Sequence, residues 1–324
     1  MTQTPLPLTE AVIQLDRLEQ DIGQAVSGQR QAIRELLVAL VAAGHALLEG
    51  VPGVGKTLLV RALAAAVQGR YARIQFTPDL MPSDVTGHAV FDLKREAFRI
   101  RRGPIFCNLL LADEINRAPA KTQAAMLEAM QEGQVTIEGQ ALALEPPFLV
   151  FATQNPIEQE GTYPLPQAQL DRFLLKIAVA PPSAEAERAA VRAATSGRIG
   201  DRLDTSAVRP LLDTETLQRL QLSATTLRLD ERVLDYAVAL VRAARDWPGV
   251  DSGPGPRASI ALVRAARAHA LIEGRDFTTP DDVRCMLPAV LRHRLRLGAE
   301  LEIEGVSADA LLGELVERVP APRD

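Results

Sequence analysis

The chain has 324 residues, of which 47% are hydrophobic and 24% are charged, and its formal net charge at pH 7 is −5. This composition is ordinary for a globular protein, and the length suits about two domains. No run of about 18 uncharged apolar residues occurs, so we expect no membrane-spanning segment. The first eight residues lack the pattern of a signal peptide, and the acidic balance argues against a general nucleic-acid binder.

Residues 1–180 alternate helical patterns with short apolar runs, which is typical of an α/β fold with a parallel sheet and crossover helices. The expected helices cover 10–22, 28–43, 56–68 and 118–132. The expected strands cover 45–49, 71–76, 108–112, 148–153 and 173–179. Two segments interrupt the alternation: residues 81–104, and residues 133–147, which read as a β-hairpin around Gly139-Gln140.

The first expected strand leads into a glycine-rich loop with the sequence Gly-Val-Pro-Gly-Val-Gly-Lys-Thr. A strand, such a loop and a helix N-terminus together favour phosphate binding, because backbone N–H groups and the helix dipole face the anion. We expect Lys56 on the β- and γ-phosphates and the Thr57 hydroxyl on Mg²⁺. The residues predicted to bind ATP here are Gly50, Pro52, Gly53, Val54, Gly55, Lys56, Thr57 and Leu58.

Two acidic residues, Asp113 and Glu114, follow the buried strand near 108–112. Ligands of open parallel sheets bind at the carboxyl ends of the strands, so both carboxylates should lie beside the glycine-rich loop. Asp113 is predicted to hold Mg²⁺, and Glu114 to orient and deprotonate an attacking water. Taken alone, a strand that simply ends in polar residues would be the better interpretation.

Another buried strand ends in Thr153-Gln154-Asn155. Asn155 is predicted to contact the γ-phosphate or the attacking water, and the alternative is an Asx turn before Pro156. Two arginines are further candidates because a guanidinium binds phosphate oxygens in pairs and stays charged. Arg172 precedes the last expected strand and Arg257 opens a later helix, but a surface ion pair, such as Arg172 with Asp171, is the alternative.

Pro181-Pro182-Ser183 marks the predicted boundary between an α/β domain at 1–180 and an all-helical domain at 181–324. The helices expected in the second domain cover 184–196, 211–222, 230–246, 257–273 and 280–297. Cys107 and Cys285 are far apart in apolar segments, so we interpret both as buried thiols of a cytoplasmic protein, without a structural zinc site.

The linked motifs resemble an AAA+ ATPase, and more narrowly the MoxR family. The resemblance rests on residues 48–57, 113–119, 127–136, 152–156, 169–173 and 256–259, and it extends over about residues 10–300. It implies an AAA+ domain with an insert in helix 2 at 81–104 and a hairpin before the sensor 1 strand, followed by an all-α lid.

The resemblance also implies a role for several residues. It implies sensor 1 at Asn155, an arginine finger at Arg172 and sensor 2 at Arg257. Residues 26–29, including Gly28, would lie near the adenine. The expected cofactors are ATP and Mg²⁺, and the expected assembly is a homo-oligomeric ring, usually a hexamer.

MoxR-like ATPases resemble chaperones that act on partner proteins, often proteins with a von Willebrand factor A domain. Two alternatives are a metal-chelatase-type motor subunit, which shares both insertions, and a DNA-associated AAA+ motor. A DNA motor needs cations on its pore hairpins, whereas residues 134–145 offer Glu138 and no Lys or Arg. The basic stretch 94–102 points the other way, but its charges alternate with Phe98 and Ile100, as on a solvated strand.

Overall fold

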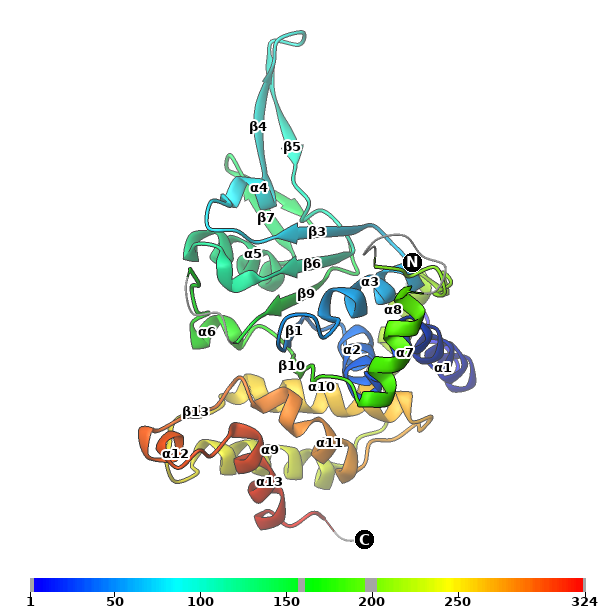
Figure 1. The fold of residues 1–324 in the computed structure, drawn as a ribbon, viewed down its shortest axis with the longest axis vertical. Coiled ribbons are helices and arrows are strands. Elements are labelled where there is room, and N and C mark those ends of the chain that lie inside the picture. The colour runs from blue at the N-terminus through cyan, green and yellow to red at the C-terminus, as the bar shows by residue number, and fades with distance from the viewer. Residues whose placement is uncertain (1–2, 157–160, 196–202, 323–324) are drawn as a thin grey trace.

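A five-stranded parallel sheet forms the centre of the computed structural model, which describes residues 3–156, 161–195 and 203–322 (Figure 1). Its strand order is β10-β1-β9-β6-β3. The strands are β1 (Ala46–Glu49), β3 (Tyr71–Gln75), β6 (Leu109–Asp113), β9 (Leu149–Gln154) and β10 (Leu175–Ala178). The predicted parallel sheet is therefore confirmed. Strands β1, β6 and β9 are the central ones, so the polar residues that end them converge on one edge.

Helices cover both faces of this sheet. They are α1 (Leu8–Ala25), α2 (Arg30–Val41), α3 (Lys56–Ala66) and α5 (Ala120–Glu132). Leu109 and Leu111 of β6 belong to the core cluster that includes α1, α2 and α3, whereas Leu110 and Ala112 belong to the cluster that includes α5. Because both faces are buried, the central strands are continuous apolar runs rather than alternating ones.

Both predicted insertions form hairpins. The first contains the short helix α4 (Pro82–Thr86) and the antiparallel pair β4 (Gly87–Asp92) and β5 (Ala97–Arg102), which projects far from the domain (Figure 1). The second pairs β7 (Gln134–Ile137) with β8 (Gln140–Ala143), as expected. Shorter elements are β2 (Val67–Gln68), η1 (Ile115–Arg117), α6 (Gln167–Leu170) and β11 (Leu212–Asp213), which pairs with β2.

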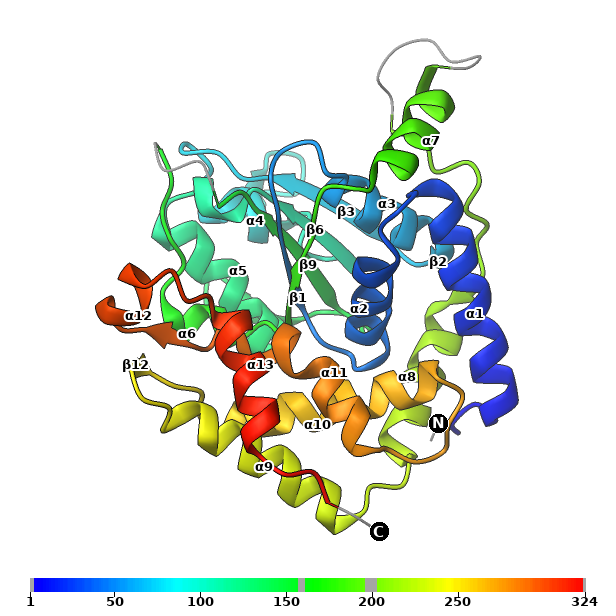
Figure 2. The same cartoon turned by 60° about the horizontal axis from the view of Figure 1, so that its bottom comes forward.

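The rest of the described chain is mainly helical (Figure 2). Its elements are α7 (Ala184–Thr195), α8 (Thr214–Thr226), α9 (Glu231–Arg245), β12 (Val250–Ser252), α10 (Pro256–Ile272), α11 (Pro280–Leu291), β13 (Arg296–Leu297), α12 (Ala299–Ile303) and α13 (Ala308–Arg318). Helix α10 packs against α2 and α8, and α11 packs against β10. The lid therefore shares one hydrophobic core with the α1–α3 side of the sheet domain.

Two sequence expectations are wrong. The helix expected over 280–297 ends at Leu291, and a turn at 292–294 follows it. The turn brings the buried Arg294 within hydrogen-bond distance of the carbonyls of Phe173 and Leu174, which directly precede β10. Cys285 is exposed rather than buried, whereas Cys107 is buried as expected. The helix expected to reach residue 196 is present to Thr195, and residue 196 lies outside the described residues. No helix in the described ranges is long and apolar enough to cross a membrane.

Candidate nucleotide-binding site

The glycine-rich loop joins β1 to the N-terminus of α3, as the sequence predicts. Gly53 and Gly55 have φ values of +84° and +92°, which residues with a side chain rarely adopt. Gly50 has a different reason to be glycine: a Cβ there would lie 2.4 Å from the carbonyl oxygen of Val179, just beyond β10. The loop therefore needs glycine for its turns and for its close approach to a neighbouring strand.

Lys56 and Thr57 open helix α3, where the helix dipole favours an anion. The Lys56 ammonium donates to the carbonyl oxygen of Val51 at 3.0 Å and also to that of Gly50. Its charge therefore lies within the loop, where a phosphate would face it. The Thr57 hydroxyl donates to Asp113, with 3.2 Å between the oxygens, so the loop and β6 meet as predicted.

Asp113 ends β6 and is the most connected acid of the site. It is buried and accepts hydrogen bonds from Thr57, from the Thr153 hydroxyl at 2.6 Å and from the Arg73 Nη2 at 2.8 Å. Arg73 lies on β3 and Thr153 on β9, so three strands and the loop helix fix one carboxylate. The sequence interpretation missed Arg73 and Thr153.

Glu114 is held in an unusual backbone conformation. Its φ is +56°, in the left-handed region, and its N–H donates to the Thr153 hydroxyl at 2.9 Å. One of its carboxylate oxygens accepts from the Gln75 amide at 2.8 Å and lies 3.1 Å from the Arg117 Nε. Strain of this kind persists only where the surroundings impose it, and it is frequent at functional sites. The Thr153 hydroxyl thus fixes the backbone of Glu114, while an amide and a guanidinium hold its carboxylate.

These residues surround a cavity of about 380 Å³. Asn155 is buried directly after β9 and lines this cavity with Asp113, Glu114 and Thr153. Most of the loop residues predicted to bind ATP also line it: Pro52, Gly53, Gly55, Lys56, Thr57 and Leu58. Gly50 and Val54, which are also predicted to bind ATP, are not among its lining residues. The structure therefore gathers six of the eight predicted loop residues, both acids and Asn155 around one space.

Gly28 does not line that cavity. It lines a neighbouring groove between α1 and α2, and a Cβ there would lie 2.3 Å from Ala186 of α7. The adjacent Gln29 nevertheless connects this segment to the loop, since its amide donates to the carbonyls of Ala180 at 2.8 Å and Val54 at 3.4 Å. The segment predicted to lie near the adenine is thus in contact with the loop.

The donor set of the cavity fits a magnesium ion. Thr57 and Asp113 supply hard oxygen ligands beside a phosphate-binding loop, and Mg²⁺ is usually held by one or two carboxylates together with waters and nucleotide phosphates. The described residues contain no group of three or more His, Cys, Asp or Glu that would form a metal site of the protein alone. A metal bound here would therefore depend on the nucleotide.

Arg172 and Arg257 lie elsewhere. They line a second cavity of about 250 Å³, and neither lines the cavity at the glycine-rich loop. Arg264 and Arg294 also line this space, and among its described lining residues Asp171 is the one carboxylate. His45 in its wall adds no charge, because burial lowers its pKa to about 4. This second cavity, which we call the arginine cavity, is suited to an anion.

The guanidinium groups of Arg172 and Arg257 differ in how firmly the surrounding residues hold them. Arg172 donates to the carbonyl oxygen of Leu127 at 2.7 Å, and its buried Nε has no hydrogen-bond partner among the residues that the structure describes. Arg257 is half exposed, and its Nη1 lies 3.7 Å from Asp171. The guanidinium of Arg257 is therefore placed where a stronger anion could replace the long contact with Asp171.

Arg294 ties the lid to the turn that carries Arg172. Its side chain is 2% exposed, and it donates to the Asp171 carboxylate at 2.7 Å, to Phe173 O at 2.7 Å and to Leu174 O at 3.2 Å. Burial lowers the pKa of this guanidinium, whereas the Asp171 carboxylate raises it. Because residues 171–174 include Arg172, the position of the lid and the position of that arginine are linked.

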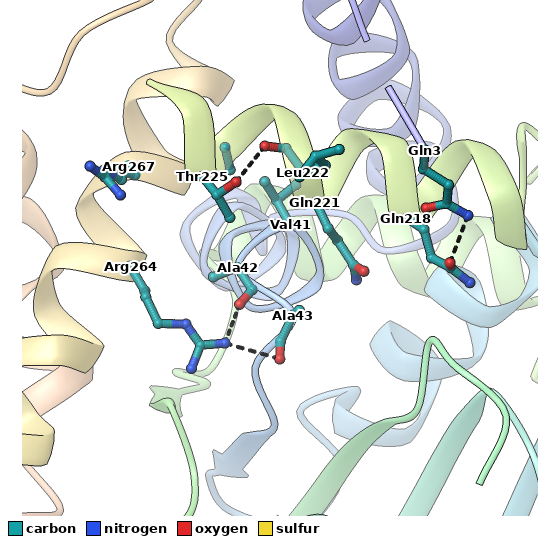
Figure 3. A pocket seen from close by; sticks show the side chains of 11 residues that line it. Gln3, Val41, Ala42, Ala43, Gln218, Gln221, Leu222, Thr225, Arg264 and Arg267 are labelled. Carbon is teal, nitrogen blue, oxygen red and sulfur yellow. Dashed lines mark hydrogen bonds between the residues drawn. The ribbon is translucent and has the colours of Figure 1, made fainter. Parts of the chain in front are cut away.

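A third and larger hollow, of about 640 Å³, adjoins the arginine cavity (Figure 3). It lies between the end of α2 and helices α8 and α10, and Ala43 and Arg264 line both spaces. Arg264 donates across the junction to the carbonyls of Ala42 and Ala43. The two hollows therefore form one continuous, arginine-bearing surface.

Comparisons with known proteins agree with this geometry. Residues 45–175 match the ATPase family associated with various cellular activities, and residues 242–315 match the AAA lid domain. The chain is 44% identical to the uncharacterized protein YeaC of Bacillus subtilis, over 95% of each chain. It is 43% identical to Chaperone MoxR1 of Mycobacterium tuberculosis, over 98% of this chain and 84% of that protein.

More distant relatives and a solved structure complete the comparison. The magnesium-chelatase 38 kDa subunit of Acidiphilium rubrum is 30% identical over 84% of this chain and 90% of its own length. The chain also resembles a crystal structure that is described as an ATPase of Cytophaga hutchinsonii. The two superpose with a TM-score of 0.88 at 37% sequence identity, over 98% of this chain and 97% of that one. The fold and the loop site define an AAA+ ATPase with a lid domain. The chain belongs to the MoxR family of these ATPases.

Proposed function

We propose that the chain binds ATP with Mg²⁺ at the glycine-rich loop and hydrolyses it to ADP and phosphate. The observation that carries this proposal is the Thr153 hydroxyl, which accepts from the Glu114 N–H and donates to the Asp113 carboxylate. One side chain thus orients the two acids that hydrolysis requires in adjacent positions. Lys56 and Thr57 complete the set on the side of the phosphates.

Each residue has a distinct part in this mechanism. Thr57 and Asp113 would hold Mg²⁺, which supplies positive charge against the β- and γ-phosphates. Glu114 accepts a proton from the attacking water, with its carboxylate oriented by Gln75 and Arg117. Asn155 positions that water or the γ-phosphate from the end of β9.

We further propose that each site is completed by a neighbouring subunit in a ring, expected to be a hexamer. Arg172 and Arg257 would then act on the γ-phosphate of the adjacent chain, the first as an arginine finger. The separation of the arginine cavity from the loop cavity supports this proposal, because neither Arg172 nor Arg257 lines the cavity at the loop of its own chain. The continuous hollow beside Arg264 offers further surface for such a neighbour.

The energy is proposed to remodel partner proteins, with a von Willebrand factor A domain protein as the expected partner. The relative described as a chaperone supports this function over the metal-chelatase motor, whose identity to this chain is lower. The DNA motor is disfavoured by the β7–β8 hairpin, which carries Glu138 and no cation. A cytoplasmic location stays a prediction.

Glu114→Gln tests the hydrolytic site. We expect turnover to fall by about a hundredfold or more, because the base is lost while the metal and phosphate contacts remain. ATP affinity, measured by titration calorimetry, should change by less than about threefold. Glu138→Gln is a matched control, since Glu138 also has a positive φ, of +47°, but lies on the β7–β8 turn. Hydrolysis at the normal rate in Glu114→Gln would remove Glu114 from the mechanism.

A further inference from the structure

The β4–β5 ribbon stands out as the part of the described chain with the most concentrated exposed apolar surface. Phe98 is 75% exposed, Leu93 at the tip 84% and Phe91 47%. The ribbon projects from the sheet domain on the side opposite the lid (Figure 1). The nucleotide site and the arginine cavity use none of these residues. The ribbon therefore needs an explanation of its own.

Strand register gives the ribbon two chemically different faces. Residues that pair directly lie on the same face of an antiparallel pair. The pairs Phe91–Phe98 and Ala89–Ile100 form one face, and the two rings pack edge to face with centroids 5.3 Å apart. The pairs Val90–Arg99 and His88–Arg101 form the other. One face is thus apolar near the tip, and the other carries Arg99 and Arg101.

The base of the ribbon holds it in one direction. A Cβ at Gly87 would lie 2.2 Å from Arg101 O, and one at Gly103 would lie 2.3 Å from Val85 O, so two glycines let the backbones cross closely. The flanking Val85 and Ile105 are fully buried and their backbones are bonded at 3.2 Å. The ribbon is therefore presented by a packed base rather than by a loose loop.

An isolated two-stranded ribbon is marginal in water, and clustered exposed apolar side chains usually mark a contact surface. Here the rings of Phe91 and Phe98 cover only part of each other. A partner that covers this face would remove a large apolar area from water and would stabilise the strand pairing. The exposed face thus indicates a macromolecular contact.

The charge of the ribbon indicates which kind of partner. Residues 87–103 carry five basic side chains against Asp92 and Glu96, and Asp92 already pairs with Arg99 at 3.3 Å. A partner surface of opposite charge, hence acidic, fits best. Nucleic acid is also acidic, but its bases stack on rings. Much of the exposed apolar surface here is aliphatic instead, with Leu93 84% and Val90 42% exposed, and this surface suits the apolar side chains of a polypeptide.

We propose that the β4–β5 ribbon is the contact for client proteins, and that it recognises an acidic polypeptide segment with apolar side chains. The Phe91–Phe98 face buries the apolar side chains, and Arg99 and Arg101 on the opposite face of the ribbon attract the carboxylates. This inference rests on the proposed function as a protein-remodelling ATPase and specifies the surface of the partner. It assigns a role to the basic stretch 94–102.

Fluorescence anisotropy with a labelled peptide of repeated Glu-Val-Leu-Gly units tests the proposal on the full chain. We expect saturable binding, weaker by about tenfold or more in the double variant Phe91→Thr/Phe98→Thr. Threonine keeps strand propensity, and Phe91→Leu/Phe98→Leu, which keeps an apolar face, should remain within about threefold of the unmodified chain. Equal losses in the Thr and Leu pairs would overturn the apolar contact.

The charge part of the proposal has a closely matched control. Arg99→Gln should weaken binding about threefold and reduce its salt dependence. The control is Arg232→Gln, which should change the peptide affinity by less than about twofold. Arg232 is 61% exposed and pairs with an aspartate at 3.1 Å, and Arg99 is 60% exposed and pairs with an aspartate at 3.3 Å, so the two variants differ mainly in location. Ile303→Thr controls for loss of an exposed apolar side chain elsewhere.

Three outcomes would overturn the inference. The first is equal binding of a Lys-Val-Leu-Gly peptide, and the second is tighter binding of oligothymidylate through the same arginines. The third is an unchanged peptide affinity in the Thr pair together with altered sedimentation, which would place the ribbon between copies of this chain. ATPase activity of the unmodified chain, measured without peptide, tests the proposed function separately. Peptide binding without that activity would leave the ribbon assignment standing and remove the motor.

Discussion

Replacement of Arg294 by Met is the change that most directly tests how the lid is attached. Methionine keeps most of the buried volume of the side chain but removes its charge and all its donors. The Asp171 carboxylate then loses its shortest ion pair, at 2.7 Å, and the carbonyl of Leu174 loses its bond to the guanidinium at 3.2 Å. The carbonyl of Phe173 keeps one donor, the His293 Nε2 at 3.1 Å.

The contacts that are lost set the expected fall in the free energy of unfolding. Breaking a buried ion pair by removing one partner costs about 3–5 kcal/mol. Asp171 is 30% exposed and can regain water, so the lower end, about 3 kcal/mol, is expected. A chain of this length unfolds with an entropy near 0.7 kcal/mol/K, so the melting temperature should fall by about 4 °C if both domains unfold together. A lid that unfolds alone would show a larger shift, because fewer residues share the loss.

Differential scanning calorimetry of Arg294→Met and of Arg232→Met measures this effect. The control removes an exposed arginine that pairs with Asp230 at 3.1 Å, so it should cost no more than about 0.5 kcal/mol. If Arg294→Met melted within about 1 °C of the control, the interpretation of Arg294 as a buried clamp would be refuted.

Three further predictions concern stability and the acid pair. Burial opposes the charge of His269, but its bond to Asp282 at 2.6 Å raises its pKa to about 9 and helps to lower that of Asp282. The stability from this pair should be complete between about pH 3.8 and 6.5 and should fade as the pH rises to about 9, and this alkaline loss should be absent in melting curves of His269→Gln. The acidic loss below about 3.8 should remain in that variant, because Arg275 also lowers the pKa of Asp282. Gly28→Ala should destabilise the chain by about 2 kcal/mol, because its φ is +76° and the added Cβ meets α7, whereas Gly23→Ala in helix α1 has open space and should stabilise slightly in urea titrations. Thr153→Val should lower ATP turnover by at least about tenfold with little change in ATP affinity, because both acids lose their shared hydroxyl, and normal turnover would contradict that role.

Much of the fold follows from local sequence signals. The buried strands are apolar runs that end in polar residues, and the helices are amphipathic with recognisable ends, as at Thr279, which caps α11. The end of α11 is different, because the sequence around Pro288 continues in a helical pattern to 297. What stops the helix is the burial of His293 and Arg294 against the segment before β10, and only the packing of the lid determines that contact.

The site was predictable to a similar degree. Residues adjacent in sequence to the loop or to strand ends, such as Thr57, Asp113 and Glu114, could be placed because parallel strands end at one edge of the sheet. The position of Arg73 was also predictable from the sequence. Arg73 and Gln75 are two residues apart in an expected strand, so their side chains lie on the same face near the carboxyl end of that strand. Arg294 left no such signal, because its partner Asp171 is 123 positions away and no local pattern distinguishes it from other arginines.

Mixing two inactive variants tests the central claim, a nucleotide site completed by the adjacent subunit. Arg172→Ala lacks the proposed finger, and Lys56→Ala lacks the phosphate-binding lysine. If subunits assemble at random in a ring, an equal mixture restores the pairing of an intact loop with an intact neighbouring arginine at about a quarter of the sites. We predict ATPase activity near a quarter of that of the unmodified chain, with a maximum at equal amounts of the two variants. No activity above that of either variant alone, at any ratio, would contradict the shared site.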